Sequence, residues 1–502
     1  MSLSLAIIVL APIACKGINS VAQSNANSSV LSATPSSSSN NTDIAPIAAT
    51  QNSYADVVSR VAPAVVTIRS ERIARAPQMP PFFDDPRLRD LFGDRLPGMQ
   101  NAPQRRLRPE RFVGSGVIVS SDGYILTNHH VVDGAEQIKV ELNDRRMFDA
   151  KLIGSDPPSD LAVLKIDATN LPVLPLGDSD KVRVGDVVLA IGNPLGIGQT
   201  VTSGIISAKG RTTPDLSDGN FEDFLQTDAP INQGNSGGAL VNTNGELVGI
   251  NSQILSPSGG SIGIGFAIPT SMARAVMDQL IKTGKVRRGQ LGIFVQPVTS
   301  DIAASLNLKE TRGVIVNQVN PGSAAERAGV QQGDIITALN GTPIVDDNDL
   351  RNRVAKTPPG TEVALTVLRG GQEQSLRATL GELTVARNSG NRTDASASDA
   401  GSEATTAKGK LGIGVQPVTP ELARELQLGD NARGLIIGDV DPTGPAADAG
   451  LQEGDMIIMA DGQNVRSVAD LTGAIARAGD RPVLLLVNRR GTTVYVPVRP
   501  RR

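Results

Sequence analysis

The stretch Gly-Asn-Ser-Gly-Gly-Ala-Leu, residues 234–240, is the part of the chain that indicates its fold and chemistry most directly. Glycines on both sides of Ser236 permit a tight turn, because glycine adopts backbone conformations that other residues avoid. Such a turn exposes the hydroxyl and allows the backbone N–H groups of Gly234 and Ser236 to point into one small space. Two N–H groups placed in this way can stabilise an oxyanion. Glycine-rich turns that contain serine also occur as purely structural turns.

A serine hydroxyl needs a base to become a good nucleophile, and the chain has only two histidines, His129 and His130. Both lie in the segment 127–132, which directly follows the apolar stretch 124–126, so we expect them at the rim of the fold, just past a strand end. Asp160 immediately precedes another apolar stretch, residues 161–166. A carboxylate there can accept the free N–H of an imidazole and fix its tautomer. Each residue alone also has an ordinary interpretation, as a surface histidine or a turn aspartate.

Short apolar segments separated by Gly, Pro, Asn and Asp fill the chain from about residue 54 to residue 283. About 230 residues of such strands favour a β-barrel or a pair of sandwiches. Residues 272–281 carry apolar side chains on one helical face; Thr270 or Ser271 can cap this helix, and Gly284 follows its end. The predicted strands are residues 65–68, 117–119, 124–127, 138–142 and 187–191.

Several further stretches accompany the serine motif, and together they resemble the HtrA/Deg (Do-like) serine proteases. The resemblance implies a chymotrypsin-like fold of two six-stranded β-barrels, with the active site in the cleft between them. The stretches are Thr-Asn-His-His-Val-Val (127–132), Ser-Asp-Leu-Ala-Val (159–163), Gly-Asn-Pro-Leu-Gly (192–196), Gln-Thr-Val-Thr-Ser-Gly-Ile (199–205), Gly-Asn-Ser-Gly-Gly-Ala-Leu (234–240) and Ile-Gly-Ile-Gly-Phe-Ala-Ile-Pro (262–269).

The resemblance also implies roles for individual residues. By position, His130 is the catalytic base, Asp160 orients it and Ser236 is the nucleophile, while the amides of Gly234 and Ser236 form the oxyanion hole. His129 falls at a variable position of the motif and is not expected to be catalytic.

Asn235 stands where trypsin-like digestive enzymes usually have Asp. Those enzymes mature by burying a new N-terminal ammonium group against that Asp. Because the amide of Asn235 carries no charge to pair, we expect activation through loop rearrangement instead. The movable parts would be the loops around residues 195–202 and 256–265.

The C-terminal half contains two copies of one module. Leu-Gly-Ile-Phe-Val-Gln-Pro-Val-Thr at 291–299 recurs as Leu-Gly-Ile-Gly-Val-Gln-Pro-Val-Thr at 411–419, and Gly-Val-Gln-Gln-Gly-Asp-Ile-Ile at 329–336 recurs as Gly-Leu-Gln-Glu-Gly-Asp-Met-Ile at 450–457. Both copies resemble PDZ domains. The whole chain is therefore expected to be mainly β, with a chymotrypsin-like double barrel followed by two PDZ-like α+β modules.

The PDZ resemblance assigns a carboxylate-binding loop to the start of each module. Backbone N–H groups there would hold a peptide C-terminus, while the peptide adds a strand to the sheet edge. Alternatively, the loops are simple hairpin ends, or their grooves are filled by the chain itself. The loop residues are Leu291, Gly292 and Ile293 in the first copy and Leu411, Gly412 and Ile413 in the second.

Residues 3–15 form an apolar run of 13 residues, shorter than the about 20 that span a bilayer. The run fits the hydrophobic region of a secretory signal that is cleaved after Ala22. Alternatively, Cys15 is a lipidated first residue, and only then is membrane association expected. Either reading predicts export to the periplasm.

Composition shifts divide the remainder of the chain. The insertion at 72–111 is rich in proline and carries Phe82 and Phe83, so it is expected to protrude, either to contact another subunit or to fold back on its barrel. The predicted organisation is a signal peptide at 1–22, a flexible serine-rich tether at 23–52, the protease domain at 53–285, the first PDZ domain at 286–384, a linker at 385–409 and the second PDZ domain at 410–500.

Charge and residue counts exclude several classes of function. The net charge is −3 and there is no long basic block, which argues against a nucleic-acid partner. One cysteine and two histidines argue against a disulfide framework and against Cys-based or multi-His metal sites. No cofactor or metal is therefore expected. The basic C-terminal residues 499–502 are expected to form a solvated tail or, alternatively, to bind an anionic surface.

The resemblance implies an exported serine endopeptidase that degrades unfolded or damaged proteins of the bacterial envelope, cleaving after small or medium aliphatic residues. It further implies regulation by C-terminal peptides, a homotrimer that can build larger cages, and a chaperone-like holding activity. The alternative function is a peptide-binding chaperone or scaffold with a largely latent protease domain, because no motif reveals the resting active fraction.

Overall fold

The computed structural model describes residues 53–73, 109–193, 198–213, 221–256, 259–383, 409–419, 422–423 and 433–501. The predicted signal peptide with Cys15, the tether and most of the linker lie outside the described residues, as does most of the proline-rich insertion with Phe82 and Phe83. The predicted bounds of the insertion, 72–111, are too wide, because strands occupy both of its ends. One strand extends to Ile73 and the next begins at Pro109.

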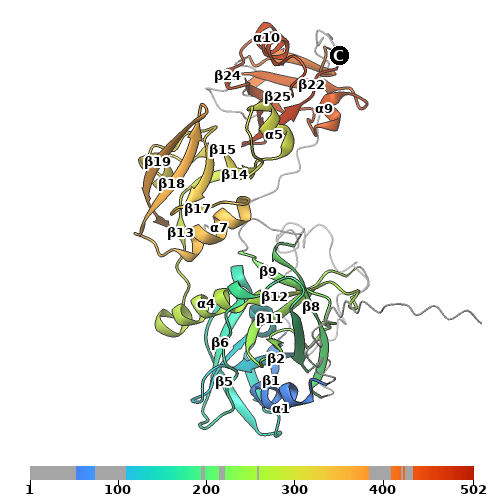
Figure 1. The fold of residues 1–502 in the computed structure, drawn as a ribbon, viewed down its shortest axis with the longest axis vertical. Helices are drawn as coiled ribbons and strands as arrows, with labels where there is room; N and C mark the ends of the chain where they lie inside the picture. The colour runs from blue at the N-terminus through green and yellow to red at the C-terminus, as the bar shows by residue number, and fades with distance from the viewer. Residues whose placement is uncertain are drawn as a thin grey trace, which may run out of the picture. The chain divides into compact units, whose positions relative to one another are not determined.

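Six antiparallel strands close into a first barrel, coloured blue to cyan in Figure 1. Their order around the barrel is β1-β2-β3-β6-β5-β4. The strands are β1 Val65–Ile73, β2 Pro109–Ile118, β3 Tyr124–Thr127, β4 Gln137–Glu141, β5 Met147–Asp156 and β6 Leu161–Ile166.

Alternation of apolar and polar residues explains how these strands close around a core. On β4, Ile138 and Val140 are buried while Gln137 is exposed, as expected of a strand with one face inward. On β6 nearly every side chain is buried, because one face lines the barrel and the other meets the neighbouring barrel. The predicted strands at 65–68, 124–127 and 138–142 are confirmed to within a residue or, for β1, extend further.

A second barrel of six strands follows, in the order β10-β11-β12-β9-β8-β7 (Figure 1). One aliphatic core joins the barrels: Leu126 and Leu161 from the first pack with Leu189 and Ile250 from the second. The strands are β7 Val187–Gly192, β8 Thr200–Arg211, β9 Phe224–Thr227, β10 Ala239–Asn242, β11 Leu247–Ile254 and β12 Gly265–Pro269.

Short helices and one long helix complete this domain. α4, Thr270–Thr283, packs its buried face against β5, β6 and β11 and ends at Gly284 in the left-handed conformation, as predicted. The predicted cap at its start is wrong. The N-cap is Pro269, and the Thr270 hydroxyl instead donates to the carbonyls of Gly177 and Val248. The short helices are α1 Ala55–Val61, η1 Ala62–Ala64, α3 His129–Val132, η4 Pro157–Ser159 and η5 Ser179–Lys181.

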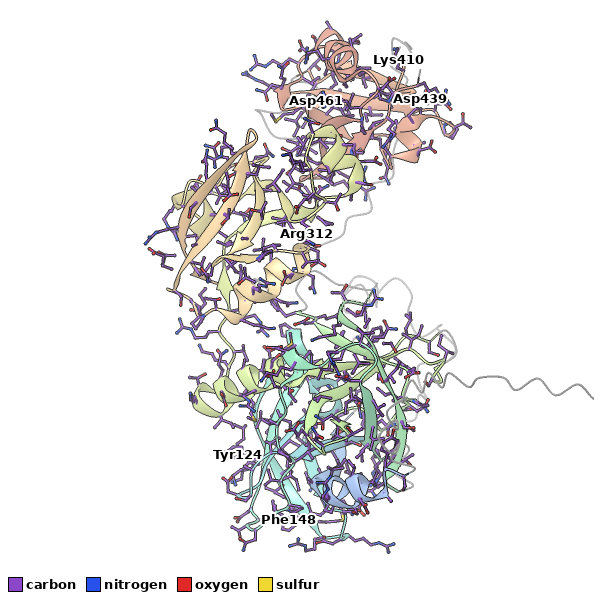
Figure 2. All side chains as sticks on the ribbon, viewed as in Figure 1. Tyr124, Phe148, Arg312, Lys410, Asp439 and Asp461 are labelled. Carbon is purple, nitrogen blue, oxygen red and sulfur yellow. The ribbon has the colours of Figure 1, made fainter. Side chains whose placement is uncertain are left out.

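Aromatic side chains are few, and two of them, Tyr124 and Phe148, are labelled in Figure 2. The Lys165 ammonium lies 5.1 Å from the Tyr124 ring centroid, and the Arg146 guanidinium carbon lies 5.8 Å from that of Phe148. Both distances are within the range of a cation–π contact. These rings therefore lie at the barrel margin, and aliphatic side chains supply most of the interior.

The first repeated module is a sheet in the order β14-β15-β16-β18-β19, with β17 paired to β16. β14 is an edge strand of this sheet. Its elements are β13 Gly289–Gln290, β14 Ile293–Pro297, α5 Ser300–Ser305, β15 Val314–Val319, α6 Ala324–Arg327, β16 Ile335–Leu339, β17 Thr342–Pro343, α7 Asp347–Lys356, β18 Glu362–Arg369, β19 Gln372–Thr379 and β20 Gly381–Glu382.

The second module repeats this topology, in the order β21-β22-β23-β25-β26. A buried carboxylate recurs at the same place: Asp334 pairs with Arg369 in the first module, and Asp455 pairs with Arg489 in the second. Its elements are β21 Ile413–Pro417, β22 Leu435–Val440, α9 Pro445–Asp448, β23 Met456–Ala460, β24 Gln463–Asn464, α10 Val468–Ala478, β25 Val483–Arg489 and β26 Thr492–Val498.

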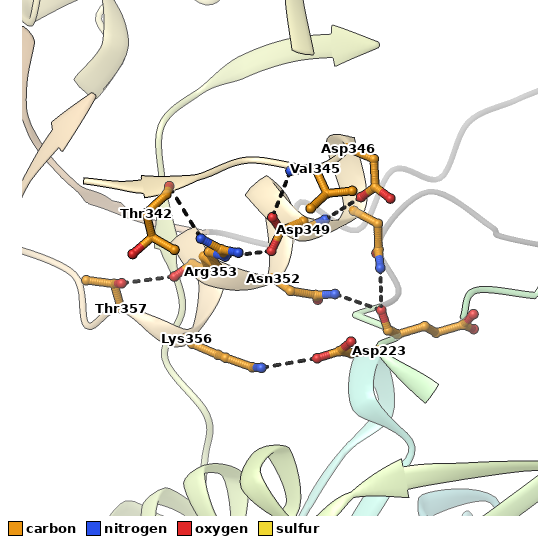
Figure 3. Close-up of polar contacts among 11 residues, drawn as sticks. Asp223, Thr342, Val345, Asp346, Asp349, Asn352, Arg353, Lys356 and Thr357 are labelled. Carbon is orange, nitrogen blue, oxygen red and sulfur yellow. Dashed lines mark hydrogen bonds and ion pairs between the residues drawn. The ribbon is translucent and has the colours of Figure 1, made fainter. Parts of the chain in front are cut away.

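Carboxylates cap the main helix of each module. At the start of α7, the Asp346 carboxylate accepts from the Asp349 N–H, and the Asp349 carboxylate accepts from the Val345 N–H (Figure 3). These bonds satisfy backbone donors that an α-helix leaves free at its start. Ser467 and Asp470 form the corresponding capping box of α10.

Among the described residues, no helix combines the length and the apolar character needed to cross a bilayer.

The cap of α10 predicts acid sensitivity at the start of that helix. Bonds from the Arg466 backbone N–H, then from the Ser467 hydroxyl and N–H, lower the pKa of Asp470 below its ordinary 3.8. Because folding lowers this pKa, the contribution of the group is present above about pH 4 and is lost as the pH falls through the folded-state value. In hydrogen exchange at pH 6, Asp470→Ala should speed exchange of the Arg466 and Ser467 amides, whose N–H groups both donate to this carboxylate at 2.9 Å.

The exposed Glu453→Ala, in the same module, is the matched control and should leave these exchange rates unchanged. In the wild type the protection should be lost as the pH falls through the lowered folded-state pKa of Asp470. Equal exchange in Asp470→Ala and wild type at pH 6 would contradict this role of the cap.

Candidate active site

The backbone at Asp160 takes a conformation that few residues other than glycine adopt. Its φ is +53°, in the left-handed region, at the end of η4 and directly before β6. The Asp156 carboxylate accepts from the Ser159 N–H at the start of this turn. Aspartate tolerates the left-handed region better than most residues. The turn therefore directs the Asp160 side chain back toward the end of β3.

His130 lies on α3, directly after β3, and contacts Asp160 through both its ring and its backbone. Its Nδ1 is 2.8 Å from Asp160 Oδ2 and 3.0 Å from Oδ1, and its N–H donates to Oδ1 at 3.0 Å. A carboxylate can only accept, so Nδ1 carries the proton and Nε2 is left as the acceptor. The predicted pairing of this histidine with Asp160 is thus present.

His129 makes a different set of contacts. Its Nε2 lies 3.6 Å from Asp133 Oδ1, while its backbone N–H donates to the carbonyl of Asp160. Its side chain does not line the cavity that contains His130. Of the two neighbouring histidines, therefore, only His130 has its ring at the site.

Ser236 lies in the same cavity as His130 and Asp160. Its hydroxyl donates to the backbone carbonyl of Ser252 at 3.0 Å. Within the described residues no hydrogen bond joins this hydroxyl to His130. The predicted residues thus meet in one cavity, but the serine and the histidine are not hydrogen-bonded to each other in this structure.

Ser252, on β11, is a site residue that the sequence reasoning missed. Its hydroxyl donates to Asp160 Oδ2 at 2.9 Å, and its carbonyl accepts from Ser236. The available signal was a serine within the apolar strand Leu247–Ile254, where a buried hydroxyl needs a partner. Sequence alone did not reveal that the partner comes from the other barrel.

The glycines around Ser236 permit the predicted tight turn. Gly234 has φ +99° and Gly237 has φ +82°. A Cβ atom on Gly237 would lie 2.1 Å from the Ser115 carbonyl oxygen and 2.3 Å from the Thr127 hydroxyl. No larger residue fits at 237, because the turn packs directly against β2 and β3.

The amides of Gly234 and Ser236, which are expected to form the oxyanion hole, differ from those of Asn235 and Gly237, which donate to the carbonyls of Asn232 and Asn251. Within the described part of the chain, no group accepts a hydrogen bond from the N–H of Gly234 or of Ser236. Asn235 is 2% exposed, and its Oδ1 finds no donor among the described residues. The expectation of activation by loop rearrangement stays a prediction, since residues 194–197 and 257–258 lie outside the described ranges.

The cavity has a volume of about 580 Å³. Besides the polar residues it is lined by Phe224, Ile231 and Ile254, which offer apolar surface to a bound side chain. In the described ranges, no group of three or more His, Cys, Asp or Glu side chains could hold a metal ion. The site thus combines an imidazole, a carboxylate, a hydroxyl and two free amides beside an apolar wall.

The predicted carboxylate loops have the same backbone form in both modules. Gly292 and Gly412 have φ +76° and +75°. The carbonyl of Gly292 accepts from the Asn320 N–H, and that of Gly412 accepts from the Asp441 N–H. Each loop leads into an edge strand, β14 or β21, whose outer side has no strand partner among the described residues.

Family models match three parts of the chain. A trypsin-like peptidase domain matches residues 114–250, and PDZ domains match residues 289–380 and 436–489. The first range runs from within β2 to within β11, and the second covers β13 to β19 of the first module. The third runs from β22 to β25 of the second module, without β21 or β26. The predicted chymotrypsin-like double barrel and the two PDZ-like modules are confirmed.

Characterised proteins resemble the chain over most of its length. The periplasmic pH-dependent serine endoprotease DegQ of Escherichia coli (strain K12) is 43% identical over 453 residues, which cover 89% of this chain and 91% of that protein. A probable periplasmic serine endoprotease, DegP-like, of Chlamydia muridarum is 43% identical over 408 residues, covering 81% and 78%.

Solved structures agree with these relatives. The HtrA-type protease AlgW with tripeptide has a TM-score of 0.54 and 46% identity, covering 66% of this chain and 98% of that one. The same protease with decapeptide gives 0.52 and 48%. The chain therefore belongs to the HtrA family of periplasmic serine endoproteases, with a trypsin-like peptidase domain followed by two PDZ domains.

Proposed function

We propose that Ser236, His130 and Asp160 form the catalytic triad of this endoprotease, and that its substrates are unfolded or damaged proteins of the envelope. The hydrogen bond from His130 Nδ1 to Asp160, within a cavity that Ser236 also lines, carries the proposal. It leaves Nε2 as the free ring nitrogen, which is the one a general base uses.

The reaction begins when the Ser236 hydroxyl leaves the Ser252 carbonyl and turns toward His130. Ser236 Oγ attacks the substrate carbonyl carbon while His130 Nε2 takes the hydroxyl proton. Asp160 stabilises the imidazolium, and the amides of Gly234 and Ser236 hold the oxyanion. The C–N bond then breaks, the amine leaves with the proton from His130, and an acyl-enzyme remains. Water, deprotonated by His130, attacks the ester carbonyl. The bond to Ser236 Oγ then breaks, His130 returns the proton to that oxygen, and the new C-terminal carboxyl group leaves.

The apolar lining supports a preference for aliphatic side chains at the cleavage point. Phe224, Ile231 and Ile254 face the cavity, and burying a Val or Leu side chain against such a wall is worth about 1.5–3 kcal/mol. A chain segment has to be extended and accessible to enter the cavity, which folded proteins seldom permit. Unfolded chains with exposed aliphatic residues are thus the substrate class that the site suits.

Replacing members of the triad tests this assignment. Ser236→Ala and His130→Ala should each lower kcat for casein digestion by at least about 10⁴-fold, because members of a triad act as a unit. Thermal unfolding should be little changed, since both side chains are partly exposed at the cavity.

His129→Ala is the matched control, because His129 is the adjacent residue on the same short helix and its ring lies outside the cavity. It should keep kcat within about threefold of wild type. Full activity in Ser236→Ala, or inactivation by His129→Ala alone, would overturn the assignment.

The PDZ domains bind peptides, and we propose that they take peptide C-termini at Leu291–Gly292–Ile293 and Leu411–Gly412–Ile413. In the first loop the Gly292 carbonyl is occupied and, among the described residues, no group accepts from the Gly292 N–H, which favours its presentation to a carboxylate. In the second loop the Gly412 N–H donates to the Gly409 carbonyl, a bond that a bound carboxylate would replace. Each edge strand can pair with an added peptide strand. AlgW, a similar HtrA-type protease, has been solved with a tripeptide and with a decapeptide. Such binding would regulate cleavage.

Amidation of a peptide C-terminus tests the carboxylate loops. A decapeptide that ends in an aliphatic residue should bind the full chain carrying Ser236→Ala, which prevents cleavage, at least about tenfold more tightly than its amidated form. Gly292→Ala should reduce this difference, because a Cβ there would lie 2.5 Å from the Ser323 Cβ. Equal binding of the acid and the amide, measured by fluorescence anisotropy, would refute the carboxylate loops.

We also propose that the working unit is a homotrimer able to form larger cages, as the resemblance to HtrA/Deg proteases implies. Sedimentation velocity of the mature chain should show a species with three times the mass of one chain. A monomer at micromolar concentration would contradict this.

A further inference from the structure

Ser115, on β2 of the first barrel, holds the turn of the second barrel that carries Ser236. Its backbone N–H donates to the Ser236 carbonyl at 2.8 Å, and its hydroxyl donates to the Gly234 carbonyl at 2.7 Å. The residue is fully buried, with 0% of its surface exposed. A single residue of one barrel thus contacts both ends of the Gly234–Ser236 segment of the other.

The direction of the hydroxyl is fixed by a second neighbour. The backbone N–H of Asn193, just past β7, donates to Ser115 Oγ at 2.8 Å. An amide N–H can only donate, so the proton of the hydroxyl remains for the Gly234 carbonyl. The Ser115 carbonyl in turn accepts from the Thr127 hydroxyl at 2.7 Å. The polar groups of Ser115 are therefore all paired.

The pairing of carbonyls and amides in the turn follows a pattern. The carbonyl of Gly234 accepts from the Ser115 hydroxyl, that of Asn235 accepts from the Gly238 N–H, and that of Ser236 accepts from the Ser115 N–H. The N–H groups of Gly234 and Ser236 have no acceptor among the described residues. Hydrogen bonds therefore hold the three carbonyls away from the cavity, and Ser115 donates two of these three bonds. The N–H groups of Gly234 and Ser236 stay available.

The hydroxyl restraint acts at the most adaptable point of the turn. Gly234 has φ +99°, and a glycine can change its backbone conformation at little steric cost. An oxyanion donor is effective only if it is aimed before the reaction begins. Without a partner for its carbonyl, the Gly234 segment would sample orientations in which its amide points elsewhere.

We propose that Ser115 is a positioning residue for the oxyanion hole: its hydroxyl, oriented by Asn193, holds the Gly234 carbonyl so that the amides of Gly234 and Ser236 stay directed at the substrate. The inference rests on the proposed role of Ser236 as nucleophile. Ser115 does not touch the substrate, because it is buried behind the turn.

Ser115→Ala removes the hydroxyl and leaves the backbone of β2 in place. It should lower kcat about 10- to 100-fold on a peptide substrate with an aliphatic cleavage-site residue, with KM changed less than about threefold. Ser179→Ala is the matched control, because Ser179 is an equally buried serine whose Oγ accepts one backbone N–H, outside the cavity. It should keep kcat within about twofold.

A pair of inhibitors separates positioning from a general structural effect. A peptide aldehyde forms a tetrahedral adduct whose oxygen occupies the oxyanion hole, whereas the corresponding peptide alcohol only occupies the cavity. Ser115→Ala should weaken the aldehyde in proportion to the loss of kcat and leave the affinity of the alcohol unchanged. If Ser115→Ala does not fold, Ser115→Cys, whose thiol is a weaker donor of similar size, should show the same selective loss.

An unchanged kcat in the folded variant would overturn the proposal, and so would equal weakening of the aldehyde and the alcohol. The same assay with Ser236→Ala distinguishes failure of the proposed triad from failure of the proposed role of Ser115. Activity that survives Ser236→Ala refutes the proposed triad, whereas an inactive Ser236→Ala beside a fully active Ser115→Ala refutes only the role of Ser115.

Discussion

The Asp160 carboxylate is the group on which the rest of the site depends. It accepts from the ring and the backbone of His130, which belongs to its own barrel, and from the hydroxyl of Ser252, which belongs to the other. It therefore orients the His130 ring and links it to β11, the strand whose Ser252 carbonyl accepts from Ser236. The geometry exists only while the barrels share their aliphatic core, so the stability of that core and the chemistry of the site are coupled.

The turn that carries Ser236 is likewise held by hydrogen bonds that link the two barrels. Its backbone carbonyls find partners, partly across the barrel boundary, while the two amides proposed to hold an oxyanion have no acceptor in the part of the chain that the structure describes. The Ser236 hydroxyl itself rests on the Ser252 carbonyl rather than on His130. Catalytic hydrogen bonds are often absent or long before substrate binds, so this arrangement describes the free enzyme. In the proposed mechanism, the Ser236 hydroxyl has to rotate toward His130 before it attacks.

Local sequence patterns predicted the elements whose conformation depends on interactions between residues close together in the sequence. The alternation at 138–142 predicted β4, Gly284 marked the end of α4, and the repeated segments predicted two modules with one topology. The motif around Ser236 and the family resemblance predicted that His130, Asp160 and Ser236 lie at one site.

Contacts between distant strands were beyond such reasoning. The sequence does not distinguish Ser115 and Ser252 from ordinary serines within strands. Their hydrogen-bond partners become neighbours only when one barrel packs on the other. The predicted cap of α4 was wrong for a related reason. Thr270 is a good capping residue by its local context, but its hydroxyl bonds to carbonyls of Gly177 and Val248 that tertiary packing brings to it. The capping propensity of a residue does not decide its role when tertiary packing gives its buried polar group a different hydrogen-bond partner.

A crystal structure of the full chain after reaction with a serine-directed peptidyl phosphonate would examine the central arrangement most directly. The account predicts phosphorus bonded to Ser236 Oγ, with one phosphonyl oxygen within about 2.7–3.1 Å of the amides of Gly234 and Ser236, and with the bond from His130 to Asp160 retained. Phosphorus on a different side chain, or an adduct on Ser236 whose oxygen is turned away from both amides, would contradict it.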